Sequence, residues 1–275
     1  MSKKSVQLSL EDVYQQKLIN RASFKSLSFG RRLFSWGSEQ NQYWLKTHVC
    51  HSHEIAEDAF LRELSFYQAC QNSEVASVLM PYQILTPFMD DDFRLGHPLL
   101  IIQHGECLFS QKASTLTLEH IQHIFLKALS AIEILHQAEW VHADLKKEHF
   151  VVDGKQAKLI DFEHCVKQSR INHEKLPINA TPRYMAPELF HHSPKTYATD
   201  IYALGIILLE WLTEQRLQAN SYQDWAVLHC QNLKISLKKE YLCFQPILEA
   251  MLKKQKEQRL SDISALKMRL VVEIV

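Results

Sequence analysis

A short β-hairpin, with an acidic residue just outside each strand, is the feature that most constrains this chain. Two apolar runs, residues 150–152 and 157–160, flank a turn signal that ends in Gly154, and this pattern predicts a two-stranded hairpin. Asp144 precedes the first run and Asp161 follows the second. Two carboxylates so placed can face one pocket, where one orients a nucleophile and the other holds a metal ion.

The composition allows a sizeable core and argues against two classes of partner. The chain has 275 residues, of which 46% are hydrophobic, and its 31 Lys and Arg residues balance its 31 Asp and Glu residues. Because no basic patch stands out, we expect no nucleic-acid partner. The apolar residues 201–212 are too few to span a bilayer and predict a helix buried on all sides. We therefore expect no membrane insertion.

The cysteines and the N-terminus favour a cytoplasmic protein. The six cysteines are scattered and form no Cys-x-x-Cys pair, a pattern typical of reduced thiols in the cytoplasm. The first residues include charges but no apolar run after them, so no signal peptide is predicted.

The first part of the chain has a mainly β-like pattern with one clear helix. The elements expected there are a lead-in helix at 8–21, strands at 24–29, 33–36 and 43–46, a helix at 54–70, and strands near 81–88 and 98–103.

The second part has a mainly helical pattern. At 117–137, apolar residues recur at steps of three and four and predict an amphipathic helix, with Thr117 as its N-cap. Residues 164–180 have no period and predict a loop, and helices are expected from Thr199 onward. We therefore expect a lead-in segment at 1–21, a small β-rich part at 22–104 and a larger part at 105–275.

Four segments in this order resemble the protein kinase superfamily, and in particular its eukaryotic-type Ser/Thr members. They are HADLK at 142–146, DFE at 161–163, ATPRYMAPE at 180–188 and TDIYALG at 199–205. They are similar to the catalytic loop, the metal-binding triplet, the substrate-docking segment and the start of the buried central helix. The resemblance implies an α+β, bilobal protein kinase-like fold over nearly the whole chain. Its small N-lobe would be β-rich with one main helix, and its larger C-lobe mostly helical.

The resemblance assigns the central chemistry to a few residues. It implies that Asp144 orients the substrate hydroxyl and accepts its proton, and that Lys146 neutralises charge on the transferred γ-phosphoryl group. Lys46 would hold the α- and β-phosphates of ATP and pair with Glu63, and Asp161 would chelate the nucleotide-bound metal ion.

The phosphate-covering loop departs from the family's pattern. The family uses three glycines so that backbone N–H groups can approach the phosphates. Here the aligned stretch at 25–30 keeps only the third glycine, Gly30, and the tip aromatic, Phe29. Either Lys25, Arg31 or Arg32 supplies positive charge instead, or the stretch is an ordinary hairpin with no phosphate role.

Three further departures concern the catalytic loop and the triplet. His149 replaces an asparagine that holds a metal ion; it could ligate Mg²⁺ or Mn²⁺ less typically, or be a neutral histidine bonded within the loop. Ala143 replaces the arginine that receives an activation-loop phosphate, so activation by that route is not expected. Glu163 replaces a flexible glycine and is expected to stiffen the segment. An Asp-Phe-Glu triplet is also familiar from related small-molecule kinases.

Four residues match structural positions of the family. Thr181 matches a threonine that bonds near the catalytic aspartate and lysine. Glu188 and Arg259 match an ion pair that ties the docking segment to the large lobe. Asp200 matches a carboxylate that holds the backbone of the catalytic loop.

The resemblance thus implies an ATP-dependent kinase that phosphorylates Ser/Thr hydroxyls of a protein substrate of unknown identity, with Mg²⁺ or Mn²⁺. The missing arginine and glycines, together with the compact size, make it look like a divergent, bacterial-like member. Two alternatives stay open. One is a pseudokinase that binds nucleotide or acts as a scaffold, and the other is a small-molecule or lipopolysaccharide-sugar kinase, against which the peptide-docking residues argue.

Overall fold

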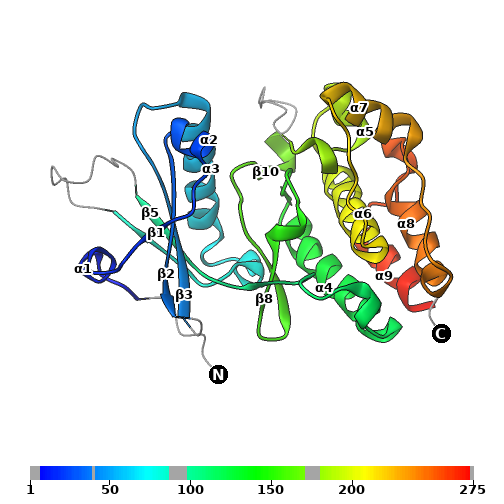
Figure 1. Ribbon diagram of the computed structural model, residues 1–275, viewed down its shortest axis with the longest axis horizontal. Coiled ribbons are helices and arrows are strands. Elements are labelled where there is room, and N and C mark those ends of the chain that lie inside the picture. Colours follow the sequence, from blue (N-terminus) through cyan, green and yellow to red (C-terminus); the bar gives the residue numbers. More distant parts are fainter. Residues whose placement is uncertain (1–6, 39–40, 87–97, 171–179, 273–275) are drawn as a thin grey trace. The chain divides into compact units, whose positions relative to one another are not determined.

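The chain divides into two compact units, each of which we describe by itself. The computed structural model describes residues 7–38, 41–86, 98–170 and 180–272. The first unit comprises residues 1–105 together with 160–163, and the second comprises residues 106–159 and 164–275 (Figure 1). The segment 160–163 therefore belongs with the first unit, although the chain on both sides of it belongs with the second.

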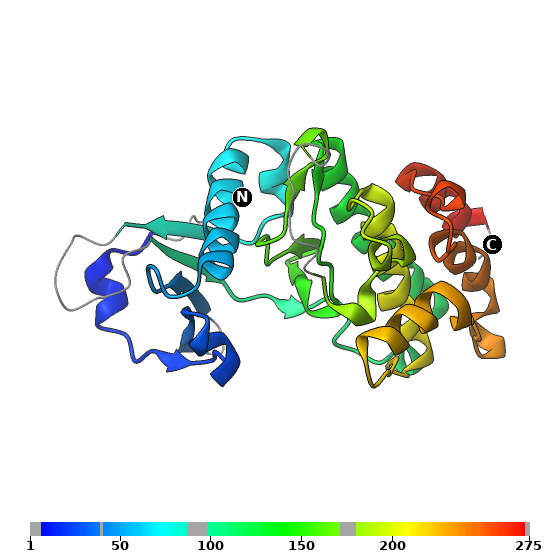
Figure 2. The same cartoon turned by 90° about the horizontal axis from the view of Figure 1, so that it is seen from above.

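The first unit is a five-stranded antiparallel sheet with one long helix (Figure 1). Its strands are β1 (Ile19–Asn20), β2 (Arg31–Ser38), β3 (Asn41–His48), β4 (Tyr82–Leu85) and β5 (Leu99–Gln103), in the spatial order β1-β2-β3-β5-β4. Its helices are α1 (Leu10–Tyr14), α2 (Phe24–Ser28) and α3 (Glu54–Cys70). Helix α3 connects β3 to β4 and contacts β3 (Figure 2).

Alternation along β3 decides which side chains reach the site. Leu45 packs with Trp36 and Ile101 in a cluster that also contains Val13 of α1. Because successive side chains of a strand point to opposite faces, the next residue, Lys46, points away from this cluster. The strand therefore buries its apolar side chain on one face and presents its lysine on the other.

Two predictions for the first unit are wrong. Residues 24–28 form helix α2 rather than a strand, because Ser23 is an N-cap whose Oγ accepts a hydrogen bond from Ser26 N–H at 3.1 Å. The lead-in helix at 8–21 is shorter than expected: α1 ends at Tyr14. The chain then pairs with β2, with Ile19 opposite Ser35, and so becomes the first strand of the sheet.

The other expectations for this unit agree with the structure. The helix at 54–70 is α3, and the strands near 43–46 and 98–103 are β3 and β5. Strand β4 lies within the stretch expected near 81–88, of which residues 87 and 88 lie outside the described residues.

The second unit is mostly helical and includes two small sheets (Figure 1). Its helices are α4 (Leu118–Gln137), α5 (Pro187–Phe190), α6 (Tyr197–Thr213), α7 (Tyr222–Val227), α8 (Gln245–Met251) and α9 (Ile263–Val272). Its strands are β6 (Glu106–Cys107), β7 (Trp140–Val141), β8 (Phe150–Asp153), β9 (Gln156–Leu159) and β10 (Val166–Lys167). The α+β fold expected from the sequence is confirmed.

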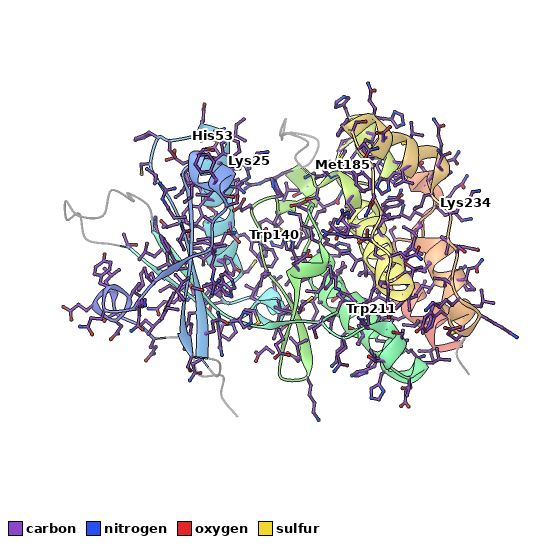
Figure 3. All side chains as sticks on the ribbon, viewed as in Figure 1. Lys25, His53, Trp140, Met185, Trp211 and Lys234 are labelled. Atoms are coloured by element: carbon purple, nitrogen blue, oxygen red, sulfur yellow. The ribbon has the colours of Figure 1, made fainter. Side chains whose placement is uncertain are left out.

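Helix α6 is the centre of the second unit. Nearly all of its side chains are buried, as expected for an apolar segment too short to cross a bilayer. Near its end, Trp211 packs edge-on against Phe109 and donates Nε1–H to the backbone oxygen of Gln111 at 2.8 Å (Figure 3). Gly205 in its middle allows close packing, because a Cβ there would lie 2.8 Å from the side chain of Leu252, which would have to shift.

The hairpin and the first helix of this unit are as predicted. Strands β8 and β9 pair antiparallel around Gly154, which has φ +60°. Thr117 caps α4 by accepting a hydrogen bond from His120 N–H. The expected loop at 164–180 is partly wrong, because Val166 pairs with Val141 in the small sheet β10-β7, and residues 171–179 lie outside the described residues.

The described helices include none that is both long and apolar enough to cross a membrane.

Glu188 and Arg259 form a buried bidentate ion pair within the second unit. Arg259 Nη1 and Nη2 lie 2.7 Å and 2.9 Å from the two carboxylate oxygens of Glu188. The arginine side chain is fully buried and also donates to the backbone oxygens of Ala198 and Lys253. Its guanidinium lies 4.8 Å from the ring centroid of Tyr202. The pair thus ties the first turn of α5 to the chain between α8 and α9.

Removing either partner of this pair should destabilise the second unit strongly. Glu188→Gln or Arg259→Met should each lower the free energy of unfolding by about 3–5 kcal/mol, because the remaining charge is buried without compensation. The double variant should lose less than the sum of the two single losses. Urea denaturation of the four proteins measures this, and purely additive losses would show that the two side chains do not interact.

Candidate active site

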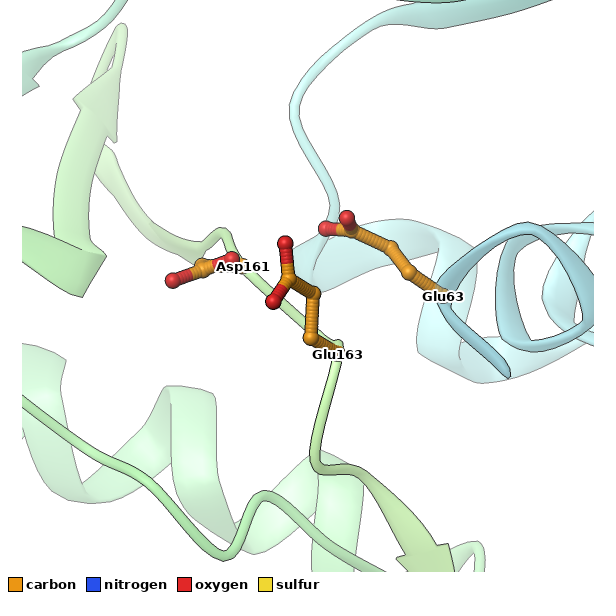
Figure 4. A group of neighbouring side chains, drawn as sticks. All are labelled: Glu63, Asp161 and Glu163. Carbon is orange, nitrogen blue, oxygen red and sulfur yellow. The ribbon is translucent and has the colours of Figure 1, made fainter. Parts of the chain in front are cut away.

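Lys46 of β3 is held by three carboxylates within the first unit. Its Nζ lies 2.6 Å from Glu63 of α3, 2.7 Å from Asp161 and 3.1 Å from Glu163. The three carboxylates point toward one another (Figure 4), and one oxygen of each lies within 4.8 Å of one oxygen of each of the other two. The expected contact between Lys46 and Glu63 is therefore present, and Asp161 joins it.

Glu63 also anchors the backbone of the triplet. Its side chain is fully buried, and its second oxygen accepts a hydrogen bond from Phe162 N–H at 3.0 Å. The Phe162 ring is buried and stacks on Phe66 of α3 at a centroid distance of 4.2 Å. Helix α3 thus fixes the triplet through one hydrogen bond and one ring contact.

The crowding of three carboxylates shapes the electrostatics of this cluster. Burial raises the pKa of Glu63 to about 7, although nearby Lys46 opposes the shift, and Asp161 and Glu163 add to it. Burial alone would lower the pKa of Lys46, but the three carboxylates outweigh it and raise that pKa well above its usual value. Lys46 is therefore firmly cationic.

Asp161 adopts a backbone conformation that few residues tolerate. Its φ is +68°, in the left-handed region where aspartate is less strained than most side chains. Such residues cluster at functional sites, where the surroundings hold them in place. Here the Asp161 side chain contacts Lys46, and the next residue, Phe162, donates its backbone N–H to Glu63; these two contacts hold Asp161 in this conformation.

The segment expected to cover phosphates is packed against its own unit. Gly30 has φ +79°, and a Cβ there would lie 1.7 Å from Ser52 Oγ. Its carbonyl oxygen accepts a hydrogen bond from Val49 N–H at 2.9 Å. The Phe29 ring lies 4.6 Å from the ring of His53, the N-cap of α3 (Figure 3). Gly30 is thus needed for this packing, and nucleotide binding by Phe29 and Gly30 stays a prediction.

Asp144 is the centre of the candidate site in the second unit. Its Oδ2 lies 2.9 Å from Lys146 Nζ, and its Oδ1 accepts hydrogen bonds from the N–H and the hydroxyl of Thr181, both at 3.1 Å. Burial acts to raise the pKa of Asp144, but Lys146 and His164 outweigh it and lower that pKa. The carboxylate is therefore charged at neutral pH and fixed in orientation.

Asp200 holds the backbone of the loop that carries Asp144. Its two carboxylate oxygens accept hydrogen bonds from His142 N–H at 2.8 Å and Ala143 N–H at 2.9 Å. Ala143 has φ +70°, a conformation that costs alanine roughly 1 kcal/mol. The buried carboxylate at the start of α6 thus stabilises a strained turn, as expected for this position.

His149 is buried in the second unit rather than exposed to solvent. Its ring stacks on that of His142 at a centroid distance of 5.5 Å, and its backbone N–H donates to the Lys146 carbonyl oxygen at 3.0 Å. Asp161, the other predicted metal ligand, belongs to the first unit. Ligation by His149 therefore stays a prediction.

The sequence analysis did not predict the contacts that Glu163 makes with Lys46 and Arg31. Glu163 was expected only to stiffen the triplet, but its carboxylate contacts Lys46 and also lies 2.7 Å from Arg31 Nη2. Arg31 was one of three basic candidates near the missing glycines. The signal in the sequence was the gain of a charge in place of glycine, which indicates a new ionic partner.

Comparison with known proteins agrees with this geometry. The model of the protein kinase domain matches residues 38–271. The chain belongs to the protein kinase domain family. In this family a lysine on β3 paired with a glutamate of the long helix is typical of active members, and Lys46 and Glu63 form that pair.

Several protein kinases are similar to the chain at low identity. The serine/threonine-protein kinase TIO of Arabidopsis thaliana is 24% identical over 207 residues, which is 74% of this chain and 15% of that protein. The serine/threonine-protein kinase PknD of Chlamydia abortus is 26% identical over 191 residues, or 58% and 20%. The serine/threonine-protein kinase PAK 4 of Homo sapiens is 34% identical over 94 residues, or 34% and 16%. The matches thus span at most a fifth of the length of these three relatives.

If His149 ligates a metal ion of the kinase reaction, His149→Asn should shift the metal preference from Mn²⁺ toward Mg²⁺. Mg²⁺ wants oxygen donors and sheds water reluctantly, whereas Mn²⁺ accepts imidazole more readily. We would measure nucleotide affinity and phosphoryl transfer with each metal, with metal-free affinity as the control. The same Mn²⁺-to-Mg²⁺ ratio in both proteins would show that His149 is not a ligand.

Proposed function

We propose that the chain is an ATP-dependent protein kinase that transfers the γ-phosphoryl group to Ser/Thr hydroxyls of a protein substrate. The observation that carries this proposal is the fixed, ionised carboxylate of Asp144 between Lys146 and Thr181. A carboxylate held in this way can orient a hydroxyl and accept its proton as the hydroxyl oxygen attacks.

The residues around Asp144 have distinct tasks in this proposal. Thr181 keeps the Asp144 carboxylate in one orientation through two hydrogen bonds. Lys146, which is about a quarter exposed, can turn its ammonium group toward the transferred phosphoryl group and neutralise charge there. Asp200 keeps the loop backbone fixed while the acceptor hydroxyl binds.

The first unit supplies the groups for nucleotide binding. Lys46 is cationic and partly exposed, which suits contact with phosphate oxygens. Asp161 is an oxygen donor of the kind that Mg²⁺ prefers, whereas a nitrogen of His149 suits Mn²⁺ better. The donor set thus fits one divalent cation well and a second one less typically. A bound cation would neutralise charge on the phosphates.

A protein substrate is favoured over a small molecule by the segment at 180–188. Thr181 at its start contacts Asp144, and Glu188 at its end is tied to Arg259 by two buried hydrogen bonds. The segment is thus fixed at both ends, which suits docking of an extended peptide beside the acceptor carboxylate. The relatives named above are described as serine/threonine kinases, which supports hydroxyl acceptors of this type.

A second function, nucleotide binding without transfer, is favoured by two observations. The segment that would cover the phosphates is a helix packed on its own unit, and Lys46 is already held by three carboxylates. A chain that binds ATP but transfers no phosphoryl group with any divalent metal would have this function.

We also propose that the first unit serves as the N-lobe and the second as the C-lobe, with the lobe boundary near His104 and a lead-in segment at 1–21. The structure pairs none of the six cysteines in a disulfide, which supports a cytoplasmic location.

Asp144→Asn should abolish most phosphoryl transfer while nucleotide affinity and the fold are kept. The change removes the proton acceptor but preserves the shape of the side chain, and we expect the turnover number to fall about 10²-fold or more. Transfer of label from γ-labelled ATP to a protein substrate measures this. Asp153→Asn, in the hairpin turn, is the matched control, and wild-type turnover by Asp144→Asn would contradict the mechanism.

A further inference from the structure

The three basic residues near the missing glycines, Lys25, Arg31 and Arg32, have different contacts in the structure. Arg32 is bonded to its own segment, because its Nη1 donates to the backbone oxygens of Leu27 at 3.1 Å and Arg31 at 3.0 Å. Lys25 lies on α2 with its Nζ 5.9 Å from the ring centroid of Phe29 (Figure 3). Of these three residues, Arg31 is the one that forms an ion pair with the carboxylate cluster within the described part of the chain, through Glu163.

Strand pairing places Arg31 on the same face of the sheet as Lys46. In the antiparallel pair β2-β3, Arg31 lies opposite His48 and Leu33 lies opposite Lys46. Opposite residues share a face, and so do residues two apart on one strand. Arg31 and Lys46 therefore lie on one face, and both contact the carboxylate of Glu163, at 2.7 Å and 3.1 Å.

The Arg31 side chain has donor capacity that the protein itself does not use. Its Nε is buried and has no hydrogen-bond partner among the described residues, although a guanidinium offers five N–H donors. The side chain as a whole is 38% exposed, whereas that of Glu163 is only 9% exposed. Part of the Arg31 side chain is therefore open to a ligand, and a phosphate group offers a guanidinium more acceptor oxygens than one carboxylate does.

We propose that Arg31 is a second phosphate-binding cation of the nucleotide site, and that Glu163 holds Arg31 and Lys46 until the nucleotide's phosphates displace its carboxylate. This inference rests on the proposed function, because its ligand is a nucleoside di- or triphosphate. No bond is made or broken in this step; one ion pair replaces another.

The proposal gives one explanation for two departures from the family's pattern, the missing glycines and Glu163. Loss of the glycines hinders the approach of backbone N–H groups to the phosphates, and helix α2 and Gly30 are packed elsewhere. A guanidinium side chain at Arg31 restores positive charge. A carboxylate in place of the triplet's glycine, Glu163, then keeps two neighbouring cations from repelling each other before nucleotide binds.

Equilibrium titration of the purified full chain with ADP, ATP and adenosine tests the proposal. Arg31→Ala should weaken the affinity for ADP and ATP about tenfold or more, as expected for one charge-assisted contact, and leave the affinity for adenosine unchanged. Arg31→Lys should give an intermediate loss, because it keeps the charge but not the fork of donors. Lys17→Ala removes an exposed cation of the same unit and should change nothing.

Glu163→Gln distinguishes direct phosphate binding by Arg31 from an effect that Arg31 has only through its contact with Glu163. This variant should bind ADP and ATP at least as tightly as wild type, because no carboxylate has to be displaced. In the double variant Arg31→Ala/Glu163→Gln, the loss caused by removing Arg31 should persist. If the loss disappears in that background, Arg31 acts only on Glu163 and the proposal is wrong.

Unchanged ADP affinity in Arg31→Ala would also overturn the proposal. A loss of ADP affinity in Lys25→Ala beside that result would assign the phosphate contact to Lys25 instead. In either case nucleotide binding by wild type would leave the proposed function intact. Absence of nucleotide binding by the wild-type chain would contradict both proposals.

Discussion

The ionic contact between Lys46 and three carboxylates is the interaction on which the rest of the candidate site depends. It links β3, α3 and the triplet at 161–163 through distances of 2.6–3.1 Å. Without the lysine, three carboxylates would lie within 4.8 Å of one another, an arrangement that strongly disfavours the charged forms. Sheet alternation, which sends Leu45 into the core and Lys46 to the opposite face, is what makes this contact possible.

In the second unit, buried charged side chains keep a strained loop in one conformation. Ala143 has φ +70°, and the buried carboxylate of Asp200 stabilises it with two hydrogen bonds to adjacent N–H groups. The Glu188–Arg259 pair fixes the far end of the segment whose first residues contact Asp144. Buried charges are costly, and here each is compensated by several hydrogen bonds. The result is that the carboxylate of Asp144, the proposed proton acceptor, is held in one orientation.

Regular patterns were predictable from the sequence, and short packed segments were not. The period of α4, the cap at Thr117 and the hairpin around Gly154 are local signals, and each has the expected form. Helix α2 has only five residues, so its formation depends on the Ser23 cap and on packing of Phe29 and Gly30 against the start of α3. The Glu163–Arg31 pair joins residues far apart in the sequence, which no periodicity reveals. The family resemblance identified the positions where such departures occur, but not how they compensate one another.

Phosphoryl transfer by the purified wild-type chain, with Lys46→Met as the blank, tests the central claim most directly. The chain is incubated with γ-labelled ATP, a protein substrate and either Mg²⁺ or Mn²⁺, and the labelled amino acids are then identified. The account predicts label on serine or threonine that depends on Lys46, because this cation holds the phosphates. Binding of ATP without transfer to any hydroxyl, with either metal, would contradict it and identify a nucleotide-binding module without kinase activity.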